Sequence, residues 1–152
     1  MKVLKFGGTS LGSAQRIKNV ASIICDQEQK IVVLSAMAGT TNSLVEISEG
    51  YHKKDPEKAN AVLSSLEQAY VNHIEELYQS DVYKEKAMQY MLERFQHVWS
   101  FSNMPFSVFD EKEILVQGEL ISTFLMACYL EEQGVKVVLL PALNFMRITM
   151  DN

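Results

Sequence analysis

The first residues constrain this chain most, because a short apolar strand runs directly into a pair of glycines. A strand is predicted over residues 2–6, and Gly7 and Gly8 follow it. Backbone N–H groups close on an anion only where no side chain intrudes, and glycine allows both that approach and an unusual turn. Lys5 adds a positive charge at the strand end. These features predict a phosphate-binding turn.

Two widespread phosphate motifs do not describe this turn. Gly-x-x-x-x-Gly-Lys-Ser/Thr does not occur in the sequence, and Thr9 stands where the dinucleotide motif Gly-x-Gly-x-x-Gly needs its second glycine. The turn is therefore neither a P-loop nor a Rossmann fingerprint. Thr9 and Ser10 would either cap the helix that follows or contact a nucleotide. A short Lys-x-Gly-Gly string alone also fits an exposed lysine before a plain turn.

The composition fits one soluble domain and excludes several functions. The chain has 152 residues, 47% of them hydrophobic, which is enough to bury a core. Its net charge is −5 and its 14 Lys and Arg are scattered, so no nucleic-acid partner is expected. The longest apolar run, residues 135–143, contains Lys136 and Pro141 and is shorter than the ~18 residues of a membrane span. With no signal region at its N-terminus, we expect a cytoplasmic protein and no membrane partner.

The cysteines and histidines do not predict a metal centre. Cys25 and Cys128 are far apart in the sequence and lie among apolar residues, so both are expected to be small buried side chains in a reducing compartment. His73 and Glu76 have helical spacing, but no third ligand is nearby. A solvated helix face is the better interpretation of that pair, and no metal site is predicted.

The first third of the chain is typical of a βαβ unit. Apolar spacing predicts a helix over residues 13–29, and the β-branched run 31–34 predicts a central parallel strand covered on both faces. A second glycine-containing segment follows that strand at residues 35–42. Ligands of parallel sheets bind beyond the carboxyl ends of the strands, so residues 5–8 and 35–41 should face one crevice.

The remainder is predicted to be mostly helical. A helix of about ten residues begins at Thr41, and two apolar stripes predict a helical hairpin over about residues 57–101 with its break at Ser80 and Asp81. Asp110 is the expected N-cap of a helix that runs to about residue 133. Gly134 would end that helix, and residues 135–140 predict a third buried strand.

One glutamate stands out within the helix predicted over residues 110–133. Gly118 costs about 1 kcal/mol relative to alanine inside a helix, so it needs a reason such as close packing or ligand approach. Glu119 shares its stripe with apolar residues, which points it inward or toward a cleft. A buried carboxylate must be paired, and either a substrate ammonium group or Lys5 would serve. The alternative is a surface glutamate at the helix edge.

Three motifs resemble aspartokinases, which are members of the amino acid kinase family. Lys-Phe-Gly-Gly-Thr-Ser at residues 5–10 is similar to their N-terminal signature, and residues 35–42 resemble Ser-Ala-x-x-Gly-x-Thr-Asn. The Gly-Glu-x-x-Ser segment at residues 118–122 resembles the helix that presents a glutamate to the substrate. The family likeness implies roles that local patterns alone leave open, since Thr41 also fits an N-cap and Ser35 a strand-end hydroxyl.

The resemblance assigns these candidate residues to two groups. The implied phosphate-binding set is Lys5, Gly7, Gly8, Thr9 and Ser10, with Lys5 also catalytic. The implied substrate-binding set is Ser35, Thr41 and Glu119. A Met-Arg-containing stretch near residue 147 is also similar to the family, but Ile148 interrupts its usual spelling, so Arg147 receives no role.

The same resemblance predicts the fold and the reaction. It implies an α/β three-layer sandwich around a mainly parallel sheet. Residues 1–152 would form the amino-acid-binding part of an amino acid kinase domain, without its C-terminal nucleotide-binding half or regulatory ACT domains, and would be inactive alone. The complete enzyme is expected to be a homo-oligomer that uses Mg²⁺ and ATP to phosphorylate the β-carboxylate of L-aspartate, the first step toward lysine, threonine and methionine. Another kinase of this fold, or a non-catalytic amino-acid-binding module, remains the alternative.

Overall fold

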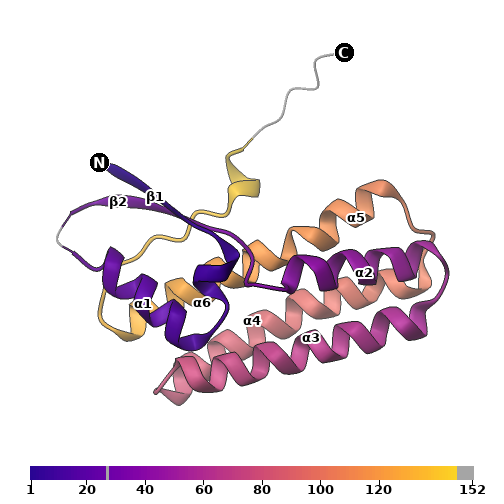
Figure 1. Ribbon diagram of the computed structural model, residues 1–152, viewed down its shortest axis with the longest axis horizontal. Helices are drawn as coiled ribbons and strands as arrows, with labels where there is room; N and C mark the ends of the chain where they lie inside the picture. Colours follow the sequence, from indigo (N-terminus) through magenta and orange to yellow (C-terminus); the bar gives the residue numbers. More distant parts are fainter. Residues whose placement is uncertain (27, 147–152) are drawn as a thin grey trace, which may run out of the picture.

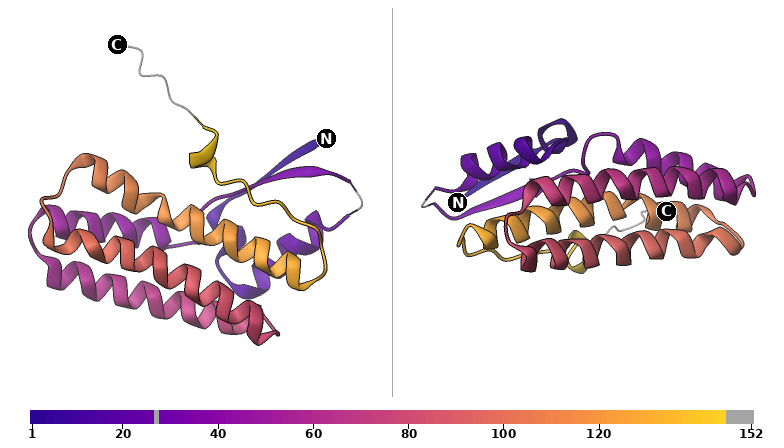
Figure 2. Two further views of the ribbon diagram at one scale, coloured as in Figure 1. Left: turned by 180° about the vertical axis from the view of Figure 1, so that it is seen from behind. Right: turned by 90° about the horizontal axis from the view of Figure 1, so that it is seen from below.

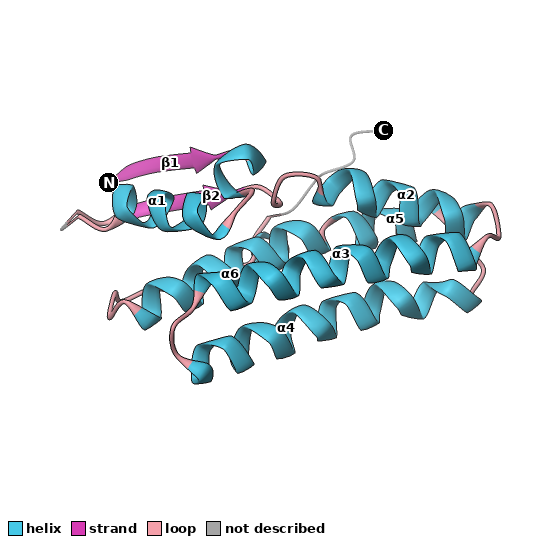
Figure 3. Ribbon diagram, turned by 60° about the horizontal axis from the view of Figure 1, so that its bottom comes forward, coloured by secondary structure: helices cyan, strands magenta, loops and turns pink. Residues whose placement is uncertain are grey.

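The computed structural model describes residues 1–26 and 28–146, and it combines a small parallel sheet with a larger helical part (Figure 1). The sheet and one short helix lie at one end of the molecule, and the long helices run side by side away from them (Figure 3). The α/β class and the parallel sheet agree with the prediction from sequence.

The two strands pair in parallel. Strand β1 spans Lys2–Phe6 and β2 spans Lys30–Leu34, with residues paired in order from Lys2 opposite Lys30 to Phe6 opposite Leu34. Helix α1, Ala14–Ile24, connects them and completes the predicted βαβ unit. The bounds of β1 are those expected, because the glycine that follows Phe6 ends the apolar run.

Helix α1 is shorter than predicted. It ends at Ile24, although the apolar spacing extended the helix to residue 29. The Asp26 side chain accepts a hydrogen bond from the backbone N–H of Glu28 at 2.9 Å, and it also pairs with the Lys30 side chain. Such side-chain bonds to the nearby backbone compete with helical hydrogen bonds and favour a turn.

Among the described residues, helices cover only one face of the sheet. Leu34 is buried, whereas Ile31 and Val33 are 44% and 43% exposed. Val3 is exposed on the neighbouring strand, opposite Ile31. The expectation that the second strand is covered on both faces is therefore wrong for this part of the chain, since a continuous β-branched run does not reveal what lies on each side.

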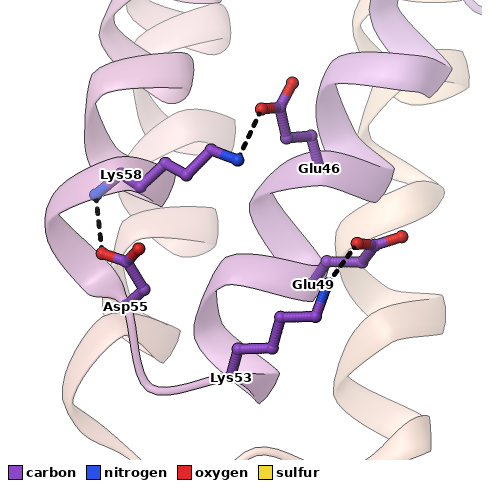
Figure 4. Close-up of polar contacts among 5 residues, drawn as sticks. All are labelled: Glu46, Glu49, Lys53, Asp55 and Lys58. Carbon is purple, nitrogen blue, oxygen red and sulfur yellow. Dashed lines mark hydrogen bonds and ion pairs between the residues drawn. The ribbon is translucent and has the colours of Figure 1, made fainter.

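The helical part begins with α2, Thr40–His52, which packs along α3, Pro56–Leu77. Charged side chains surround the turn between them (Figure 4). Asp55 caps α3 by accepting from the backbone N–H of Lys58 at 3.2 Å. Lys53 pairs with Glu49 at 2.8 Å and Lys58 with Glu46 at 3.4 Å, which as exposed pairs contribute little stability.

The predicted helical hairpin is confirmed. Helix α4, Asp81–Ser100, follows α3 after a short break and begins at its N-cap, Ser80. Helices α3 and α4 pack against each other, and α4 also packs against α6 (Figure 2). The apolar stripes of the hairpin form the centre of the core, in which Ile74, Met91 and Val98 have no exposed surface.

The predicted helix from Asp110 is divided into α5, Val108–Leu115, and α6, Gln117–Glu132. Its N-cap is Ser107 and not Asp110, so that prediction is wrong by one helical turn. Asp110 is instead the other half of a capping box, because its carboxylate accepts from the Ser107 N–H at 2.6 Å. Gly134, with φ of 75°, follows the end of α6 as predicted.

The third predicted strand does not form. Residues 135–140 keep the alternation of a strand, since Val135 and Val137 pack against the core while Val138 and Leu140 are 74% and 66% exposed. No strand of the described part of the chain pairs with this segment. Alternating burial specifies the two faces of an extended segment but not its hydrogen-bonding partner. The pattern alone was therefore not enough to predict a paired strand.

Short 3₁₀ helices occur at Gly8–Leu11, Phe101–Asn103 and Ala142–Asn144. By length and composition alone, Val108–Glu132 would be long and apolar enough to cross a membrane, but 56% of its most apolar window is buried in the fold. A core helix of a globular domain has the same properties, and the break between α5 and α6 falls within this span.

Candidate functional site

Two loops meet at the carboxyl ends of the strands, and together they are called the loop pair here: residues 7–12 and 35–39. The Ser35 N–H donates to the Phe6 carbonyl and the Ala38 N–H donates to the Gly8 carbonyl, each at 3.1 Å. A Cβ on Gly8 would lie 2.7 Å from the Ala36 oxygen. The second loop approaches so closely that position 8 requires glycine.

Gly7 differs from its neighbour because it faces open space. A Cβ at this position would meet no atom within 4 Å, and its φ of −80° is open to any residue. The fold therefore gives no packing reason for glycine at position 7. Lys5 lies two residues earlier, and its side chain is on the exposed face of the sheet. An exposed cation and an uncovered stretch of backbone thus lie two residues apart in the chain, as expected for a phosphate site.

Thr9 and Ser10 do not cap the following helix. Both lie inside the 3₁₀ turn Gly8–Leu11, and the N-cap of α1 is Ser13, whose hydroxyl accepts from the Arg16 N–H at 3.2 Å. The capping alternative is therefore wrong for both residues. Their contact with a nucleotide stays a prediction.

Arg16 is a cation at the turn that the sequence motifs did not reveal. Its guanidinium donates to the Thr9 carbonyl at 2.7 Å. The only hint in the sequence was its place in the first turn of α1, where a cation is unfavourable beside the positive end of the helix dipole.

The second loop leads into α2 through Gly39. This glycine has a left-handed φ of 86° and is the N-cap of α2, so the interpretation of Thr41 as an ordinary N-cap is wrong. Thr41 is exposed, whereas Thr40 is 2% exposed. Thr41 is therefore accessible to a ligand, whereas Thr40 is buried inside the fold.

Ser35 is held in place from two sides. Its N–H bonds to β1, and its carbonyl accepts from the Ser122 hydroxyl of α6 at 2.7 Å. Ser122 is 3% exposed and also donates to the Glu119 carbonyl at 3.2 Å. This link joins positions 87 residues apart, so no local pattern could assign it.

Close packing explains why a glycine stands at position 118, inside a helix. A Cβ there would lie 2.8 Å from the Ala36 Cβ and 3.0 Å from the Thr40 Cγ2. The start of α6 consequently lies directly against the loop pair and the first residue of α2. Glu119 is the next residue of α6, and its backbone carbonyl shares the Ser122 hydroxyl with the Ser35 carbonyl of the second loop.

Glu119 is half-buried, as its helical stripe predicted. Burial is the main cause that raises the pKa of Tyr70 to about 12, and the negative charge of Glu119 contributes to this rise. Glu119 therefore lies within electrostatic range of the Tyr70 hydroxyl. None of the ion pairs within residues 1–26 and 28–146 includes Glu119, so Lys5 is not its partner here.

Two other side chains differ from expectation. His73 is half-buried instead of solvated, with Nδ1 2.7 Å from the Ala69 carbonyl and Nε2 3.3 Å from the Gly12 carbonyl. It therefore links α3 to the first loop.

Cys25 is exposed, because α1 ends just before it, whereas Cys128 is buried as predicted. In the described part of the chain, no three His, Cys, Asp or Glu residues are grouped as metal ligands.

The structure brings Lys5, Gly7, Gly8, Ser35 and Glu119 to one end of the sheet, with Thr41 exposed at the start of α2. Arg147 lies outside the described residues. These features define an α/β protein with a candidate anion-binding turn and an adjacent carboxylate at the carboxyl edge of its parallel strands.

The sequence model of the amino acid kinase family matches residues 1–149, and the chain belongs to that family. Aspartokinase 1, chloroplastic, of Arabidopsis thaliana is 32% identical over 155 residues, which cover 99% of this chain and 27% of the relative. Lysine-sensitive aspartokinase 3 of Escherichia coli K12 is 31% identical over 135 residues, covering 88% of this chain and 29% of the relative.

A solved structure gives the same result. Escherichia coli aspartokinase III in complex with aspartate and ADP superposes with a TM-score of 0.73 at 29% identity, over 90% of this chain and 30% of that one. The predicted resemblance to aspartokinases is thereby confirmed. The chain spans less than a third of the length of these relatives.

Proposed function

We propose that this chain forms the acceptor-binding part of an ATP-dependent aspartate kinase, which transfers a phosphoryl group to the β-carboxylate of L-aspartate. The observation that carries the proposal is the loop pair, joined by the Ala38–Gly8 hydrogen bond and packed on Gly118. It gathers a cation, an open backbone turn and a carboxylate at one sheet edge. The aspartate and ADP in the Escherichia coli aspartokinase III structure support the choice of ligands.

Each candidate residue has a definite role in this proposal. Lys5 would neutralise charge that develops on the transferring phosphoryl group, and the N–H groups around Gly7 would hold phosphate oxygens. Glu119 would bind the ammonium group of the amino acid, while the hydroxyls of Ser35 and Thr41 would bind its carboxylates. Holding the acceptor in line with the phosphate supplies much of the rate enhancement in phosphoryl transfer.

Magnesium is expected together with ATP, where it would neutralise charge on the phosphates. The candidate site itself contributes one carboxylate, Glu119, and the described residues contain no cluster of metal ligands. These residues therefore do not fit a magnesium site built by this part of the chain alone. A cytoplasmic location, a homo-oligomer and a place in lysine, threonine and methionine synthesis also remain proposals.

The decisive experiment measures ADP release by the product of the complete reading frame. Mg-ATP would be supplied with L-aspartate, L-glutamate or N-acetylglutamate as acceptor. We expect release only with aspartate, and a loss of about 10²–10³-fold in kcat for Lys5→Ala if the lysine stabilises the transition state. Lys2→Ala is the matched control, because Lys2 lies on the same strand and pairs with Glu28 at the far end.

Release with another acceptor would identify a different kinase of the family. No release with any acceptor would point to a binding module. Equal activity of Lys5→Ala and Lys2→Ala would refute the role of Lys5.

A further inference from the structure

A buried hydrogen bond connects the helical hairpin to the loop pair. The Thr40 hydroxyl lies 2.9 Å from the Tyr70 hydroxyl, and both residues are 2% exposed. The two positions are 30 residues apart in the chain, one at the start of α2 and the other in the middle of α3. A buried hydroxyl that loses its partner is costly, so each of the two fixes the other.

Thr40 lies between the candidate binding groups of the acceptor. Its chain neighbour is Thr41, and its Cγ2 is the atom that a Cβ on Gly118 would meet at 3.0 Å. Glu119 follows that glycine directly. A displacement of Thr40 would consequently change the position of Thr41 through the chain and that of Glu119 through packing.

Tyr70 is well suited to hold Thr40, because the hairpin fixes its ring. The ring packs edge-on against Phe95 of α4, with centroids 5.4 Å apart and an interplanar angle of 74°. A hollow of ≈ 320 Å³ lies between α3 and residues 37–40 and 43, and both Thr40 and Tyr70 line it. The loop therefore has room to shift when the hydroxyl bond is removed.

We propose that Tyr70 and Thr40 are positioning residues, which hold the second loop and the start of α6 in the geometry that binds the amino acid acceptor. The inference rests on the proposed function for the identity of the acceptor. The hairpin of α3 and α4 then does more than fill the core, since it fixes the acceptor side of the site through one hydroxyl pair.

The kinetic test uses the product of the complete reading frame and Tyr70→Phe, which removes the hydroxyl and keeps the ring. We expect the KM for aspartate to rise ~10-fold, because small displacements of binding groups weaken productive binding. The KM for ATP should stay within about twofold, since the two hydroxyls bond to each other and to no phosphate-binding candidate among the described residues. Thr40→Val should have the same effect, and the double variant no more, if both act through one bond. Thr40→Ser, which keeps the hydroxyl and loses only the methyl group, should have a KM for aspartate closer to wild type than Thr40→Val.

Tyr78→Phe is the matched control. Tyr78 is also buried, 3% exposed, and its hydroxyl donates at 2.7 Å to the carbonyl of Leu125 in α6, which is not part of the loop pair. A change in the KM for aspartate as large in Tyr78→Phe as in Tyr70→Phe would overturn the proposal. It would show that any lost buried hydroxyl loosens the site.

A second measurement does not depend on kinase activity. Hydrogen exchange should accelerate at the amides of Thr40 and Ser43, which bond to Met37 and Gly39, in Tyr70→Phe but not in Tyr78→Phe. Unchanged exchange in Tyr70→Phe would refute the positioning role whatever the kinetics show. Faster exchange in a protein that releases no ADP would keep the positioning role of the pair and refute aspartate kinase activity instead.

Discussion

In the hairpin of α3 and α4, large apolar side chains make the contacts between elements, whereas in the loop pair the backbone makes them. Ile74, Met91 and Phe95 are at most 1% exposed and fill the space between helices. The Ala38 N–H to Gly8 carbonyl bond joins the two loops, the Ser35 N–H bonds to the end of β1, and the lack of a side chain at Gly8 allows this close approach. Stability and candidate function are thus concentrated in different regions.

The difference has a physical cause. Burial of apolar surface is the main favourable contribution to folding, and helices with one apolar stripe supply it efficiently. A site that binds an anion must instead leave N–H groups uncovered, which excludes bulky side chains. The exposed Lys5 and the open space at Gly7 fit this requirement.

The largest expected effect is the loss of stability caused by a substitution in the core of the hairpin. Ile74→Ala should reduce the free energy of unfolding by about 2–5 kcal/mol, because it leaves a cavity among residues that cannot close around it. Urea denaturation followed by circular dichroism would measure this loss. Val82→Ala is the matched control, since Val82 lies in the same hairpin but is 71% exposed, and it should change stability by less than about 0.5 kcal/mol.

Similar losses in the two variants would contradict the view that the hairpin core carries the stability of this domain.

A smaller effect is expected at the adjacent glycines of the loop pair. Gly8→Ala should destabilise the protein by about 1–3 kcal/mol, since the new methyl group would overlap the Ala36 carbonyl and force the loops apart. Gly7→Ala should leave stability within about 0.5 kcal/mol of wild type. Under the proposed function, however, it should lower kinase activity by about tenfold, because the methyl group would enter the space reserved for phosphate.

Thermal unfolding and ADP release on the two variants would test this pair. If Gly7→Ala were as active as wild type, the turn would not be a phosphate site of the proposed kind. A fully stable Gly8→Ala would show that the loops separate at little cost.

Local patterns predicted the elements far better than the links between them. The bounds of β1 and the break before Asp81 follow from glycine and polar residues beside apolar runs, and the structure agrees with both. Boundaries set by competing polar side chains were missed: Asp26 ends α1 early, and Ser107 begins α5 one turn before the expected cap. In each case several polar residues lie near the helix terminus, and the sequence does not show which of them bonds to the backbone there.

The candidate site shows the same division. The glycines, Lys5 and Glu119 were found from sequence because loops at strand ends and helical stripes have recognisable patterns. The roles of Thr40 and Ser122 were not, since their hydrogen bonds join residues 30 and 87 positions apart. Tertiary packing alone selects such partners, so the sequence identified candidate binding groups but not the residues that position them.

The smallest expected effect is a difference in reactivity between the cysteine of the βαβ unit and the cysteine of the helical part. Cys25 follows α1 at the sheet end and is exposed, whereas Cys128 is 1% exposed in α6, which packs against the hairpin. Burial raises the pKa of both thiols, against the charge of Lys30 at Cys25 and of Lys86 at Cys128, and the pKa of Cys128 rises to about 11. At pH 8, only about one Cys128 in a thousand would be the reactive thiolate, and access is blocked as well.

We therefore expect N-ethylmaleimide to modify Cys25 at least about tenfold faster than Cys128 in the folded protein, because Cys128 reacts only when α6 opens. Mass spectrometry of the peptides over a time course would measure both rates. In urea the two rates should converge, since unfolding removes both burial and the raised pKa. Equal rates in native buffer would mean that α6 opens as readily as the end of α1, and the helical part could then no longer be regarded as the more stable region.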